Sequence, residues 1–118
     1  MSPPNFAKSK GDRAERDVAA YLREHGFPFA ERRFGAGTAH DRGDIQGLVG
    51  IVVEVKSCRE FRLGPWMDET EREQHNAHAD QGVLIVRRPG KPIAQAYVVQ
   101  TLEQWARVTG DADSGVQS

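Results

Sequence analysis

A carboxylate and a lysine interrupt the most apolar short segment of the chain, residues 51–56 with the sequence IVVEVK. Alternate residues of a strand point to the same face, so Glu54 and Lys56 would project together from this segment. Burying a charge is costly unless the charge is paired or binds a metal. The pattern therefore predicts a functional site on one face of a sheet.

The preceding segment adds a second carboxylate, Asp44, if the two segments form a hairpin. A loop of Leu48, Val49 and Gly50, with Gly50 in the left-handed conformation, gives paired residue numbers that sum to 98. This register sets Asp44 directly opposite Glu54. A two-residue loop would shift the pairing by one position and separate the two carboxylates, so the predicted site depends on the loop.

A third carboxylate comes from the predicted first helix, which spans about residues 9–25. Glu15 lies three, four and seven residues before Val18, Ala19 and Leu22, so it shares their apolar helix face. A helix that packs this face against the sheet can bring Glu15 to the same patch.

The chemistry open to these side chains is metal-dependent hydrolysis. Clustered carboxylates provide the oxygen ligands that Mg²⁺ or Mn²⁺ prefers. A nearby lysine supplies positive charge beside an attacking water and beside the charge that grows on phosphorus in phosphodiester hydrolysis, and it could align or activate that water. The simpler alternative is a Glu–Lys salt bridge on a solvated sheet face. Val52 lies on the same face as Glu54, however, which favours a buried site.

The elements that must position these residues form an α/β pattern. A weak edge strand over residues 27–34, which contains Pro28, precedes the hairpin. An acidic helix over 63–80, strands over 83–86 and 93–99, and a helix that ends near Val108 follow it. We expect a flexible N-terminus (1–8), a single folded domain (9–109) and a disordered tail (110–118).

Composition places few limits on function. The 118 residues carry a net charge of −1, but residues 64–80 hold five acidic residues against one arginine, which leaves the rest mildly basic. No apolar stretch is long enough to span a membrane and no signal peptide is visible, so we expect a cytoplasmic protein. The single cysteine, Cys58, is interpreted as a reduced bystander thiol.

The order and spacing of these motifs resemble a known family. Asp44, nine intervening residues and then Glu54-Val55-Lys56, after a helix that carries Glu15, is similar to the PD-(D/E)xK nuclease superfamily. The segments KGDRAERD (10–17), GDI (43–45) and VEVKS (53–57) resemble archaeal-type Holliday junction resolvases and related phage proteins, over about residues 8–90. Gly43 stands where the family motif has proline.

The resemblance implies a restriction-endonuclease-like α/β fold, with a central mixed five-stranded sheet flanked by helices. It also implies a homodimer that cuts four-way DNA junctions with Mg²⁺ (or Mn²⁺), in the cytoplasm of a bacterium or a phage-infected host. Asp44 and Glu54 would bind the metal, Glu15 would complete the acidic site and the carbonyl of Val55 would add a ligand. Lys56 would assist the attacking water.

Basic residues flank both edges of the predicted site. They would contact DNA phosphates, because the guanidinium group of arginine can donate two parallel hydrogen bonds to phosphate oxygens. In the loop before Asp44, this chain departs from the resolvases, because Gly37-Thr38 stands where they have a Ser-Gly pair, and whether Thr38 replaces the loop serine stays open. The predicted DNA-binding residues are Arg32, Arg33, Thr38, Arg42, Arg59 and Arg62.

Two other functions stay open at this stage. One is a nuclease for duplex or damaged DNA, of the restriction or repair type, although no segment predicts a dedicated recognition domain. The other is a non-catalytic DNA-binding module with the same fold, which would be expected to have lost an acid or the lysine. His75 and His78 lie on the acidic helix without a metal-binding motif, and we interpret them as solvated or packing residues.

Overall fold

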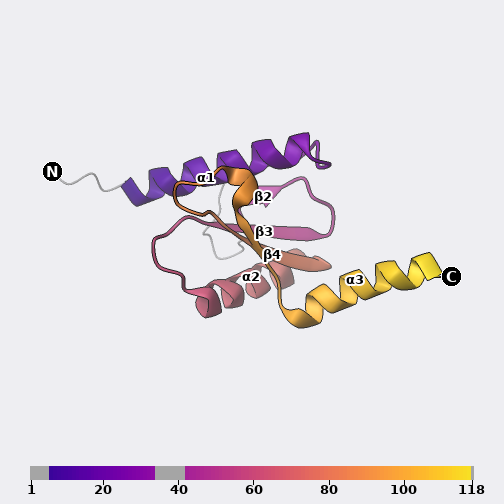
Figure 1. Cartoon of the computed structure of the whole chain (residues 1–118). Coiled ribbons are helices and arrows are strands. Elements are labelled where there is room, and N and C mark those ends of the chain that lie inside the picture. Colours follow the sequence, from indigo (N-terminus) through magenta and orange to yellow (C-terminus); the bar gives the residue numbers. More distant parts are fainter. Residues whose placement is uncertain (1–5, 34–41, 118) are drawn as a thin grey trace.

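The computed structural model describes residues 6–33 and 42–117, and these residues form three α-helices, five strands and one short 3-10 helix (Figure 1). In chain order the elements are α1 (Phe6–Glu24), β1 (Glu31–Arg32), β2 (Ile45–Gln46), β3 (Ile51–Lys56), α2 (Leu63–Ala77), β4 (Gln81–Val86), η1 (Ile93–Gln95), β5 (Tyr97–Val99) and α3 (Leu102–Gln117).

The five strands form one mixed sheet in the order β1-β2-β3-β4-β5. The pairs β1–β2, β2–β3 and β4–β5 are antiparallel, whereas β3 and β4 are parallel and are connected through α2. Parallel neighbours require such a crossover connection. The predicted α/β class and the predicted mixed five-stranded sheet flanked by helices are therefore confirmed.

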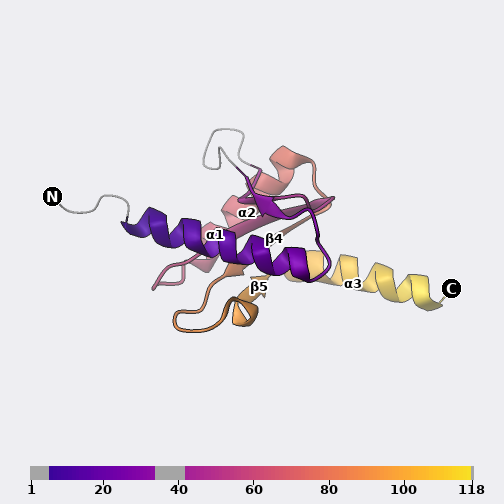
Figure 2. The same ribbon diagram turned by 90° about the horizontal axis from the view of Figure 1, so that it is seen from above.

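The helices α1 and α2 cover opposite faces of the sheet (Figures 1 and 2). On one face, Ala14 and Val18 of α1 pack against Val53 and Val55 of β3. On the other face, Trp66 of α2 packs against alternate residues of β4. The central strands are thus buried from both sides, which explains why their sequences are almost continuously apolar.

The side-chain alternation of β3 assigns each of its residues to one of these two faces. Val53 and Val55 belong to the core beneath α1, so Glu54 and Lys56 point to the face that α2 covers. The parallel partner of Glu54 is Leu84, which belongs to the core beneath α2. The two charges therefore lie at the interface between the sheet and α2.

The hairpin between β2 and β3 has the predicted register. Ile45 pairs with Val53, so paired residue numbers sum to 98 as expected. The turn closes through a hydrogen bond of 3.3 Å from the Ile51 amide to the Leu48 carbonyl, and Gly50 has a φ of +74°. Glycine accepts this left-handed conformation without the steric cost that other residues meet.

Two predicted strands are shorter than expected. The strand expected over 27–34 contains only β1, because the amide of Ala30 bonds to the carbonyl of Phe27 in a turn. The strand expected over 93–99 begins instead as η1, where the Ala96 amide bonds to the Ile93 carbonyl, and only its last three residues form β5. In both places local turn bonds replace ladder bonds beside a proline, which has no amide to donate.

The two ends of the described chain are more helical than predicted. The first helix begins at Phe6, within the segment expected to be flexible, and α3 continues to Gln117, through the segment expected to be a disordered tail. A single exposed glycine such as Gly110 costs a helix only about 1 kcal/mol and does not by itself end it. The helix α3 projects away from the sheet in both views (Figures 1 and 2). Among the described residues, no helix combines the length and apolar character needed to cross a membrane.

Gly47, which follows β2, lies very close to the backbone of Phe29, which precedes β1, and this contact can be tested. Gly47 has a φ of +93°, and a Cβ atom there would collide with the backbone carbonyl of Phe29. We expect Gly47→Ala to lower the free energy of unfolding by about 3 kcal/mol or more, measured by urea denaturation. Gly11→Ala is the control, because nothing lies near its Cβ position, and it should raise stability by about 0.5–1 kcal/mol. A loss below about 1 kcal/mol at Gly47 would contradict this close approach.

Candidate active site

Backbone hydrogen bonds fix Asp44 beside the centre of β3. The Asp44 amide donates to the Val53 carbonyl at 2.8 Å, and the Val55 amide donates to the Asp44 carboxylate oxygen Oδ2 at 2.8 Å. Asp44 is only 7% exposed and Glu54 only 3% exposed. Both carboxylates are therefore buried, and the charge of Asp44 raises the pKa of Glu54, so the two groups lie close enough to interact.

Lys56 lies between two carboxylates of different elements. Its Nζ is 3.2 Å from Glu54 Oε2 and 2.9 Å from Glu69 Oε1 of α2. Burial lowers the pKa of Lys56, but the hydrogen bond with Glu69 and the charge of Glu54 outweigh burial and raise the pKa above its ordinary value. Lys56 therefore carries its positive charge at neutral pH.

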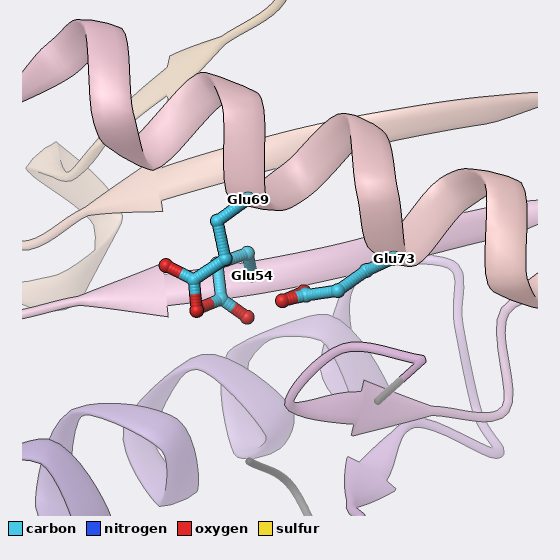
Figure 3. Close-up of side chains that lie close together, drawn as sticks. All are labelled: Glu54, Glu69 and Glu73. Carbon is cyan, nitrogen blue, oxygen red and sulfur yellow. The ribbon is translucent and has the colours of Figure 1, made fainter. Parts of the chain in front are cut away.

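The helix α2 contributes two carboxylates that the sequence analysis did not assign to the site. One carboxylate oxygen from each of Glu54, Glu69 and Glu73 lies within 4.8 Å of the other two. Figure 3 shows Glu69 and Glu73 reaching from α2 toward Glu54 on β3. Glu73 is only 2% exposed, so it belongs to the buried side of the helix.

A signal for Glu73 was present in the sequence. Trp66, Thr70 and Glu73 are the buried residues of α2, at intervals of four and three positions, and this spacing defines one helix face. The sequence analysis predicted an acidic helix over residues 63–80 but assigned none of its carboxylates to the site.

Glu15 reaches the site through Asp44. Burial raises the pKa of the Glu15 carboxyl, the charge of Asp44 raises it further, and a hydrogen bond from Arg32 opposes both effects. Arg32 Nε donates to Glu15 Oε1 at 3.1 Å. Although α1 covers the face opposite α2, Glu15 is thus close enough to Asp44 for the two charges to interact.

Five carboxylates, which we call the acidic cluster, are connected by these contacts and electrostatic interactions: Glu15, Asp44, Glu54, Glu69 and Glu73. Lys56 forms ion pairs with Glu54 and Glu69, and Arg32 forms one with Glu15. Full ionisation would bring five negative charges close together in a largely buried space.

Glu54 shows the consequence of this crowding of carboxylates. Burial raises its pKa far above the ordinary value of 4.5, and contact with the Glu73 carboxyl and the charges of Asp44 and Glu69 raise it further. Its buried oxygen Oε1 accepts no hydrogen bond from any described residue. A buried carboxylate oxygen in this position is stabilised by a proton or by a cation. An all-oxygen donor set of this kind fits a hard divalent cation such as Mg²⁺ or Mn²⁺.

The predicted DNA-binding arginines have different surroundings. Arg32 forms ion pairs with Asp12 and Glu15, so its guanidinium is engaged within the protein. The Arg33 amide donates to the Asp44 carbonyl, which places Arg33 next to the acidic cluster. The side chains of Arg42, Arg59 and Arg62 are exposed. Thr38 lies outside the described residues, and the role of the Val55 carbonyl stays a prediction.

Comparison of the chain with protein-family models, with curated protein sequences and with solved structures finds no match. The functional assignment therefore depends on the geometry of the acidic cluster. His75 and His78 do not contribute to that geometry, because both are exposed and His78 caps the end of α2 in the left-handed conformation.

The raised pKa of Glu54 leads to a prediction about stability and pH. The folded protein keeps a proton on Glu54 that the unfolded protein releases above about pH 4.5. The contribution of this proton to the free energy of unfolding is therefore complete below about pH 4.5 and is lost as the pH rises toward the raised pKa of Glu54. Glu54→Gln removes this ionisation while it keeps the side-chain shape. We expect the free energy of unfolding of wild type, minus that of Glu54→Gln, to fall as the pH is raised in a buffer that contains a chelator. The fall should be up to about 1.4 kcal/mol per pH unit. Urea denaturation at several pH values measures the difference, and a constant difference would contradict the raised pKa.

Proposed function

We propose that the chain is a metal-dependent DNA endonuclease with a PD-(D/E)xK site on a restriction-endonuclease-like fold. The observation that carries this proposal is that the buried carboxylates Asp44 and Glu54 interact and that Lys56 is paired with Glu54. Glu69 and Glu73 extend the same site from α2. The substrate that we propose is the four-way DNA junction, by resemblance, with a homodimer cutting both strands.

Asp44, Glu54, Glu69 and Glu73 are the residues that would hold a divalent cation. When bound, Mg²⁺ or Mn²⁺ would supply a Lewis acid for the phosphodiester and would lower the pKa of a water. The buried oxygen Oε1 of Glu54, which accepts no hydrogen bond among the described residues, supports this reading. The hydrogen bond from the Val55 amide orients the Asp44 carboxylate in advance.

Lys56 supplies positive charge in this proposal. Its raised pKa keeps it protonated at neutral pH, so it is suited to orient a water molecule and to stabilise negative charge on the phosphate oxygens, and not to remove a proton. The pairing with Glu54 and Glu69 limits the positions of its ammonium group. Such preorganisation is the usual source of electrostatic stabilisation in phosphoryl chemistry.

Cleavage of labelled DNA with Mg²⁺ tests the assigned residues. We expect Glu54→Gln and Lys56→Met each to lower the cleavage rate by a factor on the order of 10² or more, because each removes charge from the reacting centre. Glu71→Gln is the matched control, since Glu71 is an exposed acid on the same helix as Glu69 and Glu73. Chelator should abolish cleavage by wild type. Undiminished cleavage by Glu54→Gln would refute the site.

The same assay separates the candidate substrates. A four-way junction, a linear duplex of the same sequence and a single strand are compared at equal nucleotide concentration. Preferential cutting of the junction supports the resolvase proposal, whereas equal cutting of duplex and junction would leave a general nuclease. DNA binding without cleavage under every metal condition would favour a non-catalytic module.

Direct metal binding tests the contribution of α2. We expect Glu73→Gln to weaken Mn²⁺ binding by roughly tenfold or more, because it removes one carboxylate that lies within 4.8 Å of its two neighbours. Calorimetric titration of the protein with Mn²⁺ gives the affinity, and Glu71→Gln again serves as the control. If the two variants bind Mn²⁺ equally well, α2 does not contribute to the metal site.

A further inference from the structure

A second feature lies at the carboxyl ends of the parallel strands β3 and β4, where a pocket of about 320 Å³ opens between α1 and two loops. The residues after β3, the turn after β4 and one residue of α1 form its walls. Its lining comprises Arg13, Ser57, Cys58, Arg59, Arg87 and the Pro89-Gly90 turn.

The pocket is strongly basic, although the whole chain has a net charge of −1. Asp17 neutralises part of this charge through an ion pair of 2.6 Å with Arg87. Arg13 and Arg59 are exposed and form no ion pair with another described residue. Two arginines are therefore available to an anion, and the third is held in place by Asp17.

The pocket is directly connected to the candidate active site. Ser57 follows Lys56 in the chain, and the Arg87 amide donates to the Lys56 carbonyl at 2.9 Å. Three residues of extended chain, from Lys56 to Arg59, span at most about 10 Å. A DNA strand presents one phosphate for roughly every 3.4 Å of helix rise, so this reach corresponds to about three nucleotides.

Size and chemistry both fit a phosphate group. A volume of about 320 Å³ is large enough for a phosphate group. Guanidinium groups bind phosphate oxygens with two parallel hydrogen bonds, and the Ser57 hydroxyl adds a neutral donor at the same place.

We propose that this pocket binds a backbone phosphate of the nucleic-acid strand that flanks the scissile phosphate, and so fixes the strand relative to Lys56. The inference rests on the proposed nuclease function and names the contact that would position its substrate. Arg13 and Arg59 contact the phosphate, and Arg87 is oriented toward it by Asp17. Cys58 lines the same pocket, so its thiol reports whether the pocket is occupied.

Salt dependence of DNA binding is the first test, carried out in chelator with a fluorescent duplex and the full chain. Arg13→Ala and Arg59→Ala should each weaken binding by roughly tenfold and reduce the slope of log affinity against log salt by about 1. Arg72→Ala is the control, because Arg72 is an exposed arginine of α2 outside the pocket. Unchanged slopes in both pocket variants would overturn the proposal, and a general loss of folding would be visible as altered circular dichroism.

Alkylation of Cys58 is the second test, because it is the only cysteine of the chain. Bound duplex should slow the reaction of Cys58 with iodoacetamide, and the alkylated protein should bind DNA as weakly as Arg59→Ala does. Cys58→Ser, which cannot be alkylated, should bind DNA normally after the same treatment. Equal protection by inorganic phosphate, at the same phosphate concentration as the duplex, would indicate a site for a free anion instead of a strand.

These outcomes are separable from the outcome for the active site. If wild type fails to cut DNA with Mg²⁺ but the salt slopes fall and Cys58 is protected, the nuclease proposal fails and the phosphate pocket stands. If wild type cuts DNA while the slopes are unchanged and Cys58 stays reactive, the nuclease proposal stands and the pocket assignment is wrong.

Discussion

Repulsion between carboxylates in a buried space is the constraint around which this molecule is organised. Two unit charges 4.8 Å apart, the limit that encloses the oxygens of Glu54, Glu69 and Glu73, repel by about 3.5 kcal/mol at an effective dielectric constant of about 20. Lys56 offsets part of this repulsion through its two ion pairs. The remainder is opposed by apolar packing, because α1 and α2 each bury a separate core against the same sheet. Burial of this kind is the dominant stabilising contribution in small domains.

The sheet supplies the precision that such a cluster needs. Glu54 lies on β3, which has a strand on either side, and its position is therefore fixed by ladders in both directions. Asp44 belongs to the hairpin partner and is tied to β3 by two hydrogen bonds of 2.8 Å. The crossover helix α2 then lies over the same face and adds its own carboxylates. Each charged group is thus carried by an element that is itself buried, so the charges cannot move apart to relieve their repulsion.

The parts of this arrangement that depend on local rules could be predicted from the sequence. The register of the β2–β3 hairpin, which brings Asp44 near Glu54, follows from a three-residue loop ending in glycine. The presence of Glu15 near Asp44 follows from its spacing to apolar helix residues. Glu73 was missed although its spacing to Trp66 and Thr70 places it on their helix face, because whether that face covers Glu54 depends on how α2 packs against the sheet, which is a tertiary effect. The short strands were overestimated for a similar reason, since turn bonds next to proline compete with ladder bonds.

The acidic cluster and the pocket lined by Arg13, Arg59 and Arg87 have opposite electrostatic effects on the phosphates of a nucleic acid. The carboxylates around Glu54 repel a phosphate when they are ionised, whereas Arg13 and Arg59 in the neighbouring pocket attract one. On the proposed function, a strand held in the pocket would approach Lys56 only after cations had neutralised the acidic cluster. Metal binding and the approach of the strand would then be linked thermodynamically, with each favouring the other. The small net charge of the chain conceals this separation of charge between two neighbouring sites.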